Sequence, residues 1–172
     1  MKFVITVNIL VVLLFGETLQ PVTYVNPQKF SGLWYEIART HNTYQERCVA
    51  SSVEYKLVDS LEYEVFNRCF EDKIGGELIE YTGSAEPTKG TNMSSITMTY
   101  YWIFSKKYNV YYLQSNYDYA VVADQEFEQV WIMSRRPTMP KEKLSEIVTY
   151  LSQGFDIKRL IYTPQDVDGR YR

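Results

Sequence analysis

The sequence predicts an all-β protein: an eight-stranded antiparallel up-and-down barrel with one C-terminal α-helix packed outside it. Three observations lead to this prediction. Short segments with alternating apolar and polar residues recur at the spacing of a meander, and only one segment near the C-terminus changes to a helical period. The 172 residues are 45% hydrophobic and include 16 tyrosines, a composition that favours strands and suffices for one well-buried domain.

Residues 1–20 are predicted to be a signal peptide. Lys2 is followed by an apolar run from Phe3 to Phe15, which has the length of a signal-peptide core and is short for a membrane span. An uncleaved anchor or a buried strand is the alternative interpretation, and no Ala-x-Ala-like pair marks a cleavage site. We therefore expect export, to the periplasm or the extracellular space.

The first strand is expected from Leu33 to Thr40. Asn26-Pro27 is typical of a helix start, so Pro27 to Ser31 should form one short turn that plugs an end of the barrel. After Gly32 the residues alternate between two faces, and the face expected to look inward carries Trp34, Glu36 and Ala38.

Seven more strands follow by the same alternation. They are expected at Val49 to Val58, Leu61 to Phe70, Glu77 to Glu86, Met93 to Phe104, Tyr108 to Gln114, Tyr119 to Ala123 and Glu128 to Ser134, with one turn at Lys106-Lys107. The period then changes: Lys141 to Gln153 has one apolar stripe and predicts an amphipathic helix that docks on the barrel. A last short strand is expected from Lys158 to Tyr162.

The inward face of the barrel is predicted to bind a ligand. Alternation selects as ligand-binding residues Glu36, Ala38, Tyr55, Val65, Asn67, Met98, Tyr100, Val110, Tyr112, Val122, Trp131 and Met133. This face is mostly apolar with a few polar groups, as a site for one small amphiphile requires. The alternative is that these side chains fill the barrel and no ligand enters.

The sequence gives little support to other chemistries. The net charge is −3, from 18 basic and 21 acidic residues, so we expect no nucleic-acid partner. His41 is the single histidine, and the sequence has no nucleophile elbow, phosphate loop or Cys-x-x-Cys pair. We expect a protein that is not an enzyme and has no cofactor or metal ion. The alternative is a lipid-modifying or thiol-dependent enzyme that uses the same cavity through Cys48.

Three motifs in a fixed order resemble the lipocalin family. They are Gly32-Leu33-Trp34, Ser115-Asn116-Tyr117-Asp118-Tyr119, and the Trp131-Ile132-Met133-Ser134-Arg135 strand end. With Gly154-Phe155-Asp156-Ile157 further on, the chain looks most similar to bacterial outer-membrane lipoprotein lipocalins and to apolipoprotein D. The second motif departs from the family pattern, with Asn116 where Asp is common and one residue fewer before the next Tyr. Residues 24–164 form the lipocalin domain by this resemblance, and residues 165–172 a polar tail.

The resemblance implies a structural and a functional role. Gly32, Trp34 and Arg135 should close one end of the barrel, with the guanidinium over the indole ring. The cavity should bind or carry a fatty acid, a lysophospholipid or a similar membrane lipid, and a peripheral association with membranes is expected. In the lipoprotein relatives a Cys receives the lipid anchor, but Leu14-Phe15-Gly16 is followed here by Glu17, so we expect no such anchor. The oligomeric state is not predicted.

Cys48 and Cys69 are expected to form a disulfide in an exported protein. Simple alternation puts Cys48 outside the barrel and Cys69 inside, so a direct bridge needs a bulge or a strand end between them. Bacterial lipocalins carry a similar pair, and this resemblance favours the bridge. Two inert, partly buried thiols are the alternative.

Overall fold

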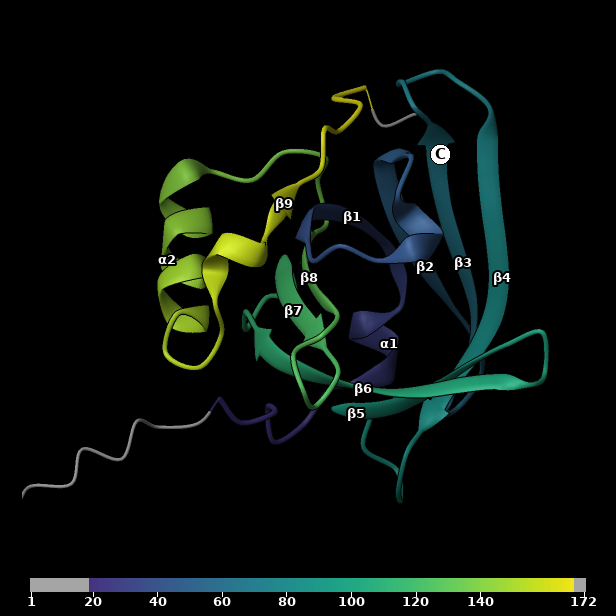
Figure 1. Ribbon diagram of the computed structural model, residues 1–172. Helices are drawn as coiled ribbons and strands as arrows, with labels where there is room; N and C mark the ends of the chain where they lie inside the picture. Colours follow the sequence, from purple (N-terminus) through teal and green to yellow (C-terminus); the bar gives the residue numbers. More distant parts are fainter. Residues whose placement is uncertain (1–18, 169–172) are drawn as a thin grey trace, which may run out of the picture.

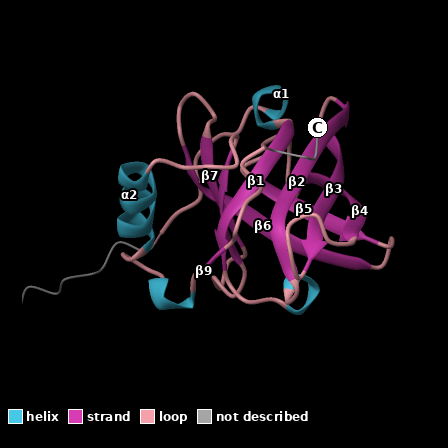
Figure 2. Ribbon diagram, turned by 90° about the horizontal axis from the view of Figure 1, so that it is seen from above, coloured by secondary structure: helices cyan, strands magenta, loops and turns pink. Residues whose placement is uncertain are grey.

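A computed structural model describes residues 19–168. The predicted signal peptide, apart from its last two residues, lies outside them. The described chain forms a closed antiparallel barrel with one helix, α2 (Lys141–Leu151), on its outside (Figures 1 and 2). The predicted fold class is therefore confirmed. None of the helices in residues 19–168 is long and apolar enough to cross a membrane.

Eight strands make the barrel. They are β1 (Gly32–Arg39), β2 (Cys48–Asp59), β3 (Glu62–Glu71), β4 (Leu78–Pro87), β5 (Ser95–Tyr100), β6 (Phe104–Leu113), β7 (Tyr119–Ala123) and β8 (Val130–Ser134). Each pairs with the next, and β1 closes the barrel by pairing with both β8 and β2. A short β9 (Ile161–Tyr162) follows the 3₁₀ turn Ile157–Arg159 and pairs with β1.

The β5–β6 turn lies where the sequence did not indicate it. We expected the chain to turn at Lys106-Lys107, but these lysines lie in β6 and pair with Met98 and Thr97. The turn is instead formed just before β6, where Tyr101 and Trp102 have φ of 51° and 61°. Such angles are typical of Gly and Asn, so two aromatic residues give no turn signal in the sequence.

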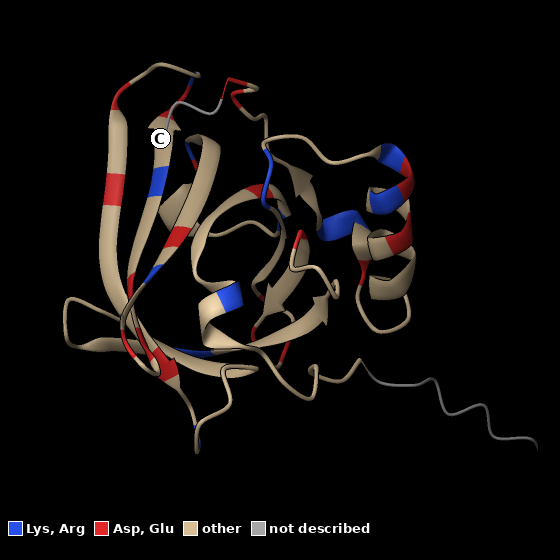
Figure 3. Cartoon of the chain, turned by 180° about the vertical axis from the view of Figure 1, so that it is seen from behind, with Lys and Arg blue, Asp and Glu red and all other residues tan. Residues whose placement is uncertain are grey.

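Two apolar cores lie on either side of the barrel wall. The inner core lies inside the barrel and includes Trp34, Tyr63 and Val65. The outer core lies between the barrel and α2, where Ile147 and Leu151 pack among side chains of β1, β7 and β8. The amphipathic helix α2 thereby buries its apolar stripe against the barrel. Basic and acidic residues are interspersed along the strands and α2 (Figure 3).

A short helix and an arginine close one end of the barrel. In α1 (Pro27–Phe30), Asn26 caps the first turn by accepting a hydrogen bond from the Lys29 amide at 3.0 Å. The fully buried Trp34 donates from Nε1 to the carbonyl of Phe30 at 2.9 Å. The helix is thereby fastened to the first residues of β1.

Arg135 completes this closed end. Its guanidinium carbon lies 3.8 Å from the centroid of the Trp34 ring. It also donates to the backbone carbonyls of Lys29, Ser31 and Leu33, at 2.7, 2.9 and 2.9 Å. Burial lowers the pKa of Arg135 to about 10, so it remains a cation at neutral pH. A single side chain that follows β8 thus joins α1, β1 and the indole.

Gly32 leaves room for this arrangement. Its φ of 99° is strained for any residue with a Cβ, and a Cβ there would lie 3.3 Å from Nη1 of Arg135. The position therefore needs glycine for both its backbone and its neighbour.

The predicted disulfide between Cys48 and Cys69 is confirmed, with the two Cα atoms 5.4 Å apart. The register of β2 against β3 shifts between Val49 and Ser52, and Ala50 has a φ of 50°. This shift reverses the alternation in the first residues of β2, so Cys48 turns to the same face as Cys69. The bulge that a direct bridge required is present.

Replacing Trp34 by alanine should destabilise the domain by about 3–5 kcal/mol, because the substitution empties the floor of the core and removes the surface on which Arg135 stacks. Urea unfolding measures this, and Trp102→Ala is the matched control because that indole is 97% exposed. Equal effects of the two substitutions would contradict the role given to Trp34.

Opening the disulfide should cost roughly 3 kcal/mol, because the bond closes a loop with a sequence separation of 21 residues in the unfolded chain. The comparison is between oxidised wild type and the Cys48→Ala/Cys69→Ala double variant. Reductant should lower the melting temperature of the wild type only. Two alkylatable thiols in the oxidised protein would contradict the bond.

Candidate functional site

The inner face of the barrel gathers most of the predicted ligand-binding residues. Six of them are buried in the inner core, namely Tyr55, Val65, Met98, Val110, Val122 and Met133. Tyr100 and Trp131 pack against that core and are partly exposed. The same core contains Tyr63, Ile96 and Tyr108, which the prediction did not include although simple alternation on their strands could have found them. It also contains Met93, which lies in the turn before β5, where alternation gives no guide.

Two predicted residues face the other way. Tyr112 lies outside the barrel, where its hydroxyl donates to Glu146 of α2 at 3.0 Å and its ring lies 5.8 Å from that of Tyr150. Ala38 belongs to the outer core as well. In both strands the pairing register shifts, between Val110 and Tyr112 and just before Ala38, so alternation fails from that point on.

The polar groups of the interior include an amide and a phenol in contact. Asn67 donates from Nδ2 to the hydroxyl of Tyr100 at 2.7 Å. Burial raises the pKa of Tyr100 to about 12, so this hydroxyl is neutral and free to donate in turn. The pair offers one neutral polar contact above the apolar core.

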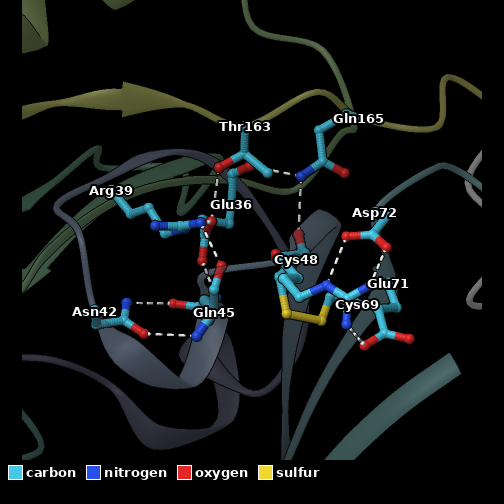
Figure 4. Close-up of a disulfide and its surroundings, with 12 residues drawn as sticks. Glu36, Arg39, Asn42, Gln45, Cys48, Cys69, Glu71, Asp72, Thr163 and Gln165 are labelled. Carbon is cyan, nitrogen blue, oxygen red and sulfur yellow. Dashed lines mark hydrogen bonds and ion pairs between the residues drawn. A yellow bond between two sulfur atoms is a disulfide. The ribbon is translucent and has the colours of Figure 1, made fainter.

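A second polar cluster surrounds Glu36. Its carboxylate is buried and accepts hydrogen bonds from Oγ1 of Thr163 at 2.7 Å and from Nε2 of Gln45 at 2.6 Å (Figure 4). Nε of Arg39, also buried, lies 3.2 Å from Glu36 Oε1. Burial raises the pKa of Glu36, and the hydrogen bonds and the Arg39 cation oppose this shift.

Gln45 joins this cluster to the barrel wall. It ends the 3₁₀ turn Thr43–Gln45 in the β1–β2 connection, and its Oε1 accepts from Nε1 of Trp131 at 3.1 Å. Nδ2 of Asn42 donates to the same oxygen at 2.7 Å. The loop is therefore held against an inward residue of β8. No motif marked Gln45, because two of its partners, Glu36 and Trp131, lie in the separate strands β1 and β8.

The C-terminal segment fills the seam between β1 and β2. These strands pair only from Gly32 to Tyr35 on the β1 side. Beyond that point Gln165 donates from Nε2 to the carbonyls of Glu36 and Ser51, at 2.5 and 2.8 Å. Gln165 was predicted to begin a polar tail, but here it bridges two barrel strands.

The candidate catalytic groups lie apart from this interior. His41 is exposed in the β1–β2 connection. Cys48 and Cys69 are bonded to each other, so neither presents the thiol that the alternative of a thiol-dependent enzyme needs. Within residues 19–168, no three His, Cys, Asp or Glu side chains converge as a metal site would require.

Comparison with known proteins points to one family. The family model described as a lipocalin-like domain matches residues 25–165. The chain is 32% identical to the R877 protein of Acanthamoeba polyphaga mimivirus over 78% of this chain and 81% of that protein. It is 29% identical to the outer membrane lipoprotein Blc of Vibrio cholerae, over 87% and 88% of the two chains. It is 25% identical to apolipoprotein D of Macaca fascicularis, over 88% and 84%.

The raised pKa of Glu36 predicts a pH dependence of stability. A carboxyl whose pKa in the folded state lies above its ordinary 4.5 binds its proton more tightly when folded. Its stabilising contribution is thus complete below that ordinary value and is lost as the pH rises through the folded-state pKa. Glu36→Gln cannot titrate, so its unfolding free energy should fall less over this range than that of the wild type. Urea unfolding at a series of pH values, with exposed Glu62→Gln as control, measures this. Parallel profiles for wild type and Glu36→Gln would contradict it.

Proposed function

The chain belongs to the lipocalin family, whose members bind small hydrophobic ligands, and from this membership we propose that it binds one single-chain membrane lipid in its barrel. The ligand is a long-chain fatty acid, a lysophospholipid or a similar lipid, held reversibly and without conversion. The observation that carries the proposal is the continuous apolar core inside the barrel, from the Trp34 floor to the polar contacts at Asn67 and Glu36.

The closed floor fixes the direction of entry. Trp34, Phe30 and Arg135 occupy one end, with the Phe30 and Trp34 ring centroids 5.0 Å apart. The apolar tail of a ligand therefore enters first from the opposite end. Buried methylene groups contribute about 0.8 kcal/mol each before entropic losses, so the tail supplies most of the affinity.

Methionines give the interior the ability to adapt. Met93, Met98 and Met133 are all buried in the inner core. Their unbranched side chains change rotamer at low cost, unlike those of Val or the aromatic residues around them. We infer that a lipid tail makes its space by moving these three side chains. If these side chains did not move, they would fill the barrel and no ligand would enter.

The polar contacts favour a neutral or zwitterionic head. Asn67 and Tyr100 are neutral hydrogen-bonding groups, and Tyr112 is removed from the interior by its contact with Glu146. Glu36 already has Thr163, Gln45 and Arg39 as partners. An ionised Glu36 would repel a carboxylate brought close to it. The lysophospholipid is therefore the preferred class over the fatty acid.

Export is part of the proposal. A disulfide forms and persists in oxidising compartments, and Cys48–Cys69 is such a bond. One relative is named as an outer membrane lipoprotein. We propose that this protein is exported to the periplasm or the extracellular space.

Titration of delipidated protein with lysophospholipids of increasing chain length should show saturable binding. Affinity should rise by about fourfold per methylene until the interior is full. Trp131 is the expected reporter, so Trp131→Phe should remove the fluorescence change while the exposed Trp102→Phe keeps it. Met133→Trp should abolish binding because it fills the space, and Met133→Leu should retain it. No saturable signal at any chain length, or undiminished binding by Met133→Trp, would refute the proposal.

A further inference from the structure

The tip of the β5–β6 hairpin carries the longest run of exposed large apolar side chains within residues 19–168. Tyr101, Trp102, Ile103 and Phe104 are 65%, 97%, 75% and 64% exposed. Neither of the two apolar cores includes them. A contiguous apolar surface of this kind on a soluble protein marks an interaction site.

The turn at the tip has a backbone conformation that aromatic residues rarely adopt. Tyr101 and Trp102 both lie in the left-handed region, and the turn is closed by a hydrogen bond from the Ile103 amide to the Tyr100 carbonyl at 3.3 Å. Gly or Asn would adopt these angles with less strain than an aromatic residue. Local folding therefore does not account for the aromatic rings, which the turn directs into solvent.

The hairpin also extends beyond its neighbours. The first residue of β6 that pairs with β7 is Asn109, so Phe104 to Tyr108 are paired with β5 alone. In two perpendicular views the hairpin tip stands out from the barrel past β4 (Figures 1 and 2). A projecting tip can insert into a deformable surface while the barrel wall stays clear of that surface.

We propose that this tip docks the protein on a lipid bilayer by inserting into the headgroup region. Four residues on a convex tip are too few for a protein interface, which buries about 800 Å² on each partner. Trp and Tyr suit the interface, because each combines a large apolar ring with one polar group, while Ile103 and Phe104 reach toward the acyl chains.

The charges around the tip specify a zwitterionic bilayer. Lys107 is exposed and follows Phe104 by three residues, about 10 Å along a strand, which places its ammonium group near the lipid phosphates. Glu62 and Glu64 line the same surface hollow as Tyr101 and Trp102. These carboxylates and the net charge of −3 oppose attraction to an anionic surface. Apolar insertion therefore dominates over charge attraction.

This docking does not depend on the proposed ligand, since none of the four tip residues belongs to the inner core. The two proposals can accordingly fail separately. Met133→Trp, which should block the interior, should leave docking unchanged.

The experiment is co-sedimentation of the full chain with phosphatidylcholine vesicles. Wild type should bind, and Trp102→Ser/Phe104→Ser should weaken the partition by at least about tenfold. Tyr44→Ser/Tyr162→Ser, which removes two aromatic residues that are 71% and 56% exposed elsewhere, is the matched control and should bind as the wild type does. Raising the salt from about 0.1 M to about 1 M should not release the protein.

A second readout tests insertion directly. In Trp131→Phe protein the exposed indole is Trp102, and vesicles should shift its emission to shorter wavelength and shield it from an aqueous quencher. Three results would overturn the proposal: no sedimentation of the wild type, equal loss in the control pair, or self-association that disappears in Trp102→Ser/Phe104→Ser without any binding to vesicles.

Discussion

The contact between the Arg135 guanidinium and the Trp34 ring is the interaction on which the rest of the structure depends. A barrel must be closed at one end before its interior can exclude water, and this pair supplies the closure. The guanidinium also donates hydrogen bonds to backbone carbonyls of α1, of Ser31 after it and of β1. The carbonyls of Lys29 and Ser31 lie at the C-terminal end of α1, where the last carbonyls of a helix have no partner within the helix.

The closed floor also determines how the interior can be used. With one end occupied, the inward apolar side chains form a single core, and polar groups at Asn67 and Glu36 lie beside it. Those polar groups are held by segments distant in the chain, namely the β1–β2 connection through Gln45 and the C-terminal segment through Thr163 and Gln165. Residues that look like a loop and a tail thus form part of the barrel wall.

The exterior of the barrel has two apolar surfaces, one covered and one exposed. One is covered by α2, whose stripe packs on β1, β7 and β8. The other, at the β5–β6 tip, has no cover in the described chain and is held outward by a strained turn. The same residue type has opposite roles in the two places: Trp34 is buried to close the barrel, and Trp102 is presented to the surroundings.

The sequence by itself determined the barrel, the docked helix, the closing residues and the family, because alternation, helical period and short motifs are local properties. The tertiary structure decided three features that alternation of apolar and polar residues does not predict: register shifts, one turn and the partners of a buried carboxylate. Irregular registers in β1, β2 and β6 turned Ala38 and Tyr112 outward and brought Cys48 to the side of Cys69. A turn made by Tyr101 and Trp102 carried no Gly or Asn to reveal it. The partners of Glu36 come from residues 39, 45 and 163, and only closure of the barrel brings them within hydrogen-bonding distance of one carboxylate.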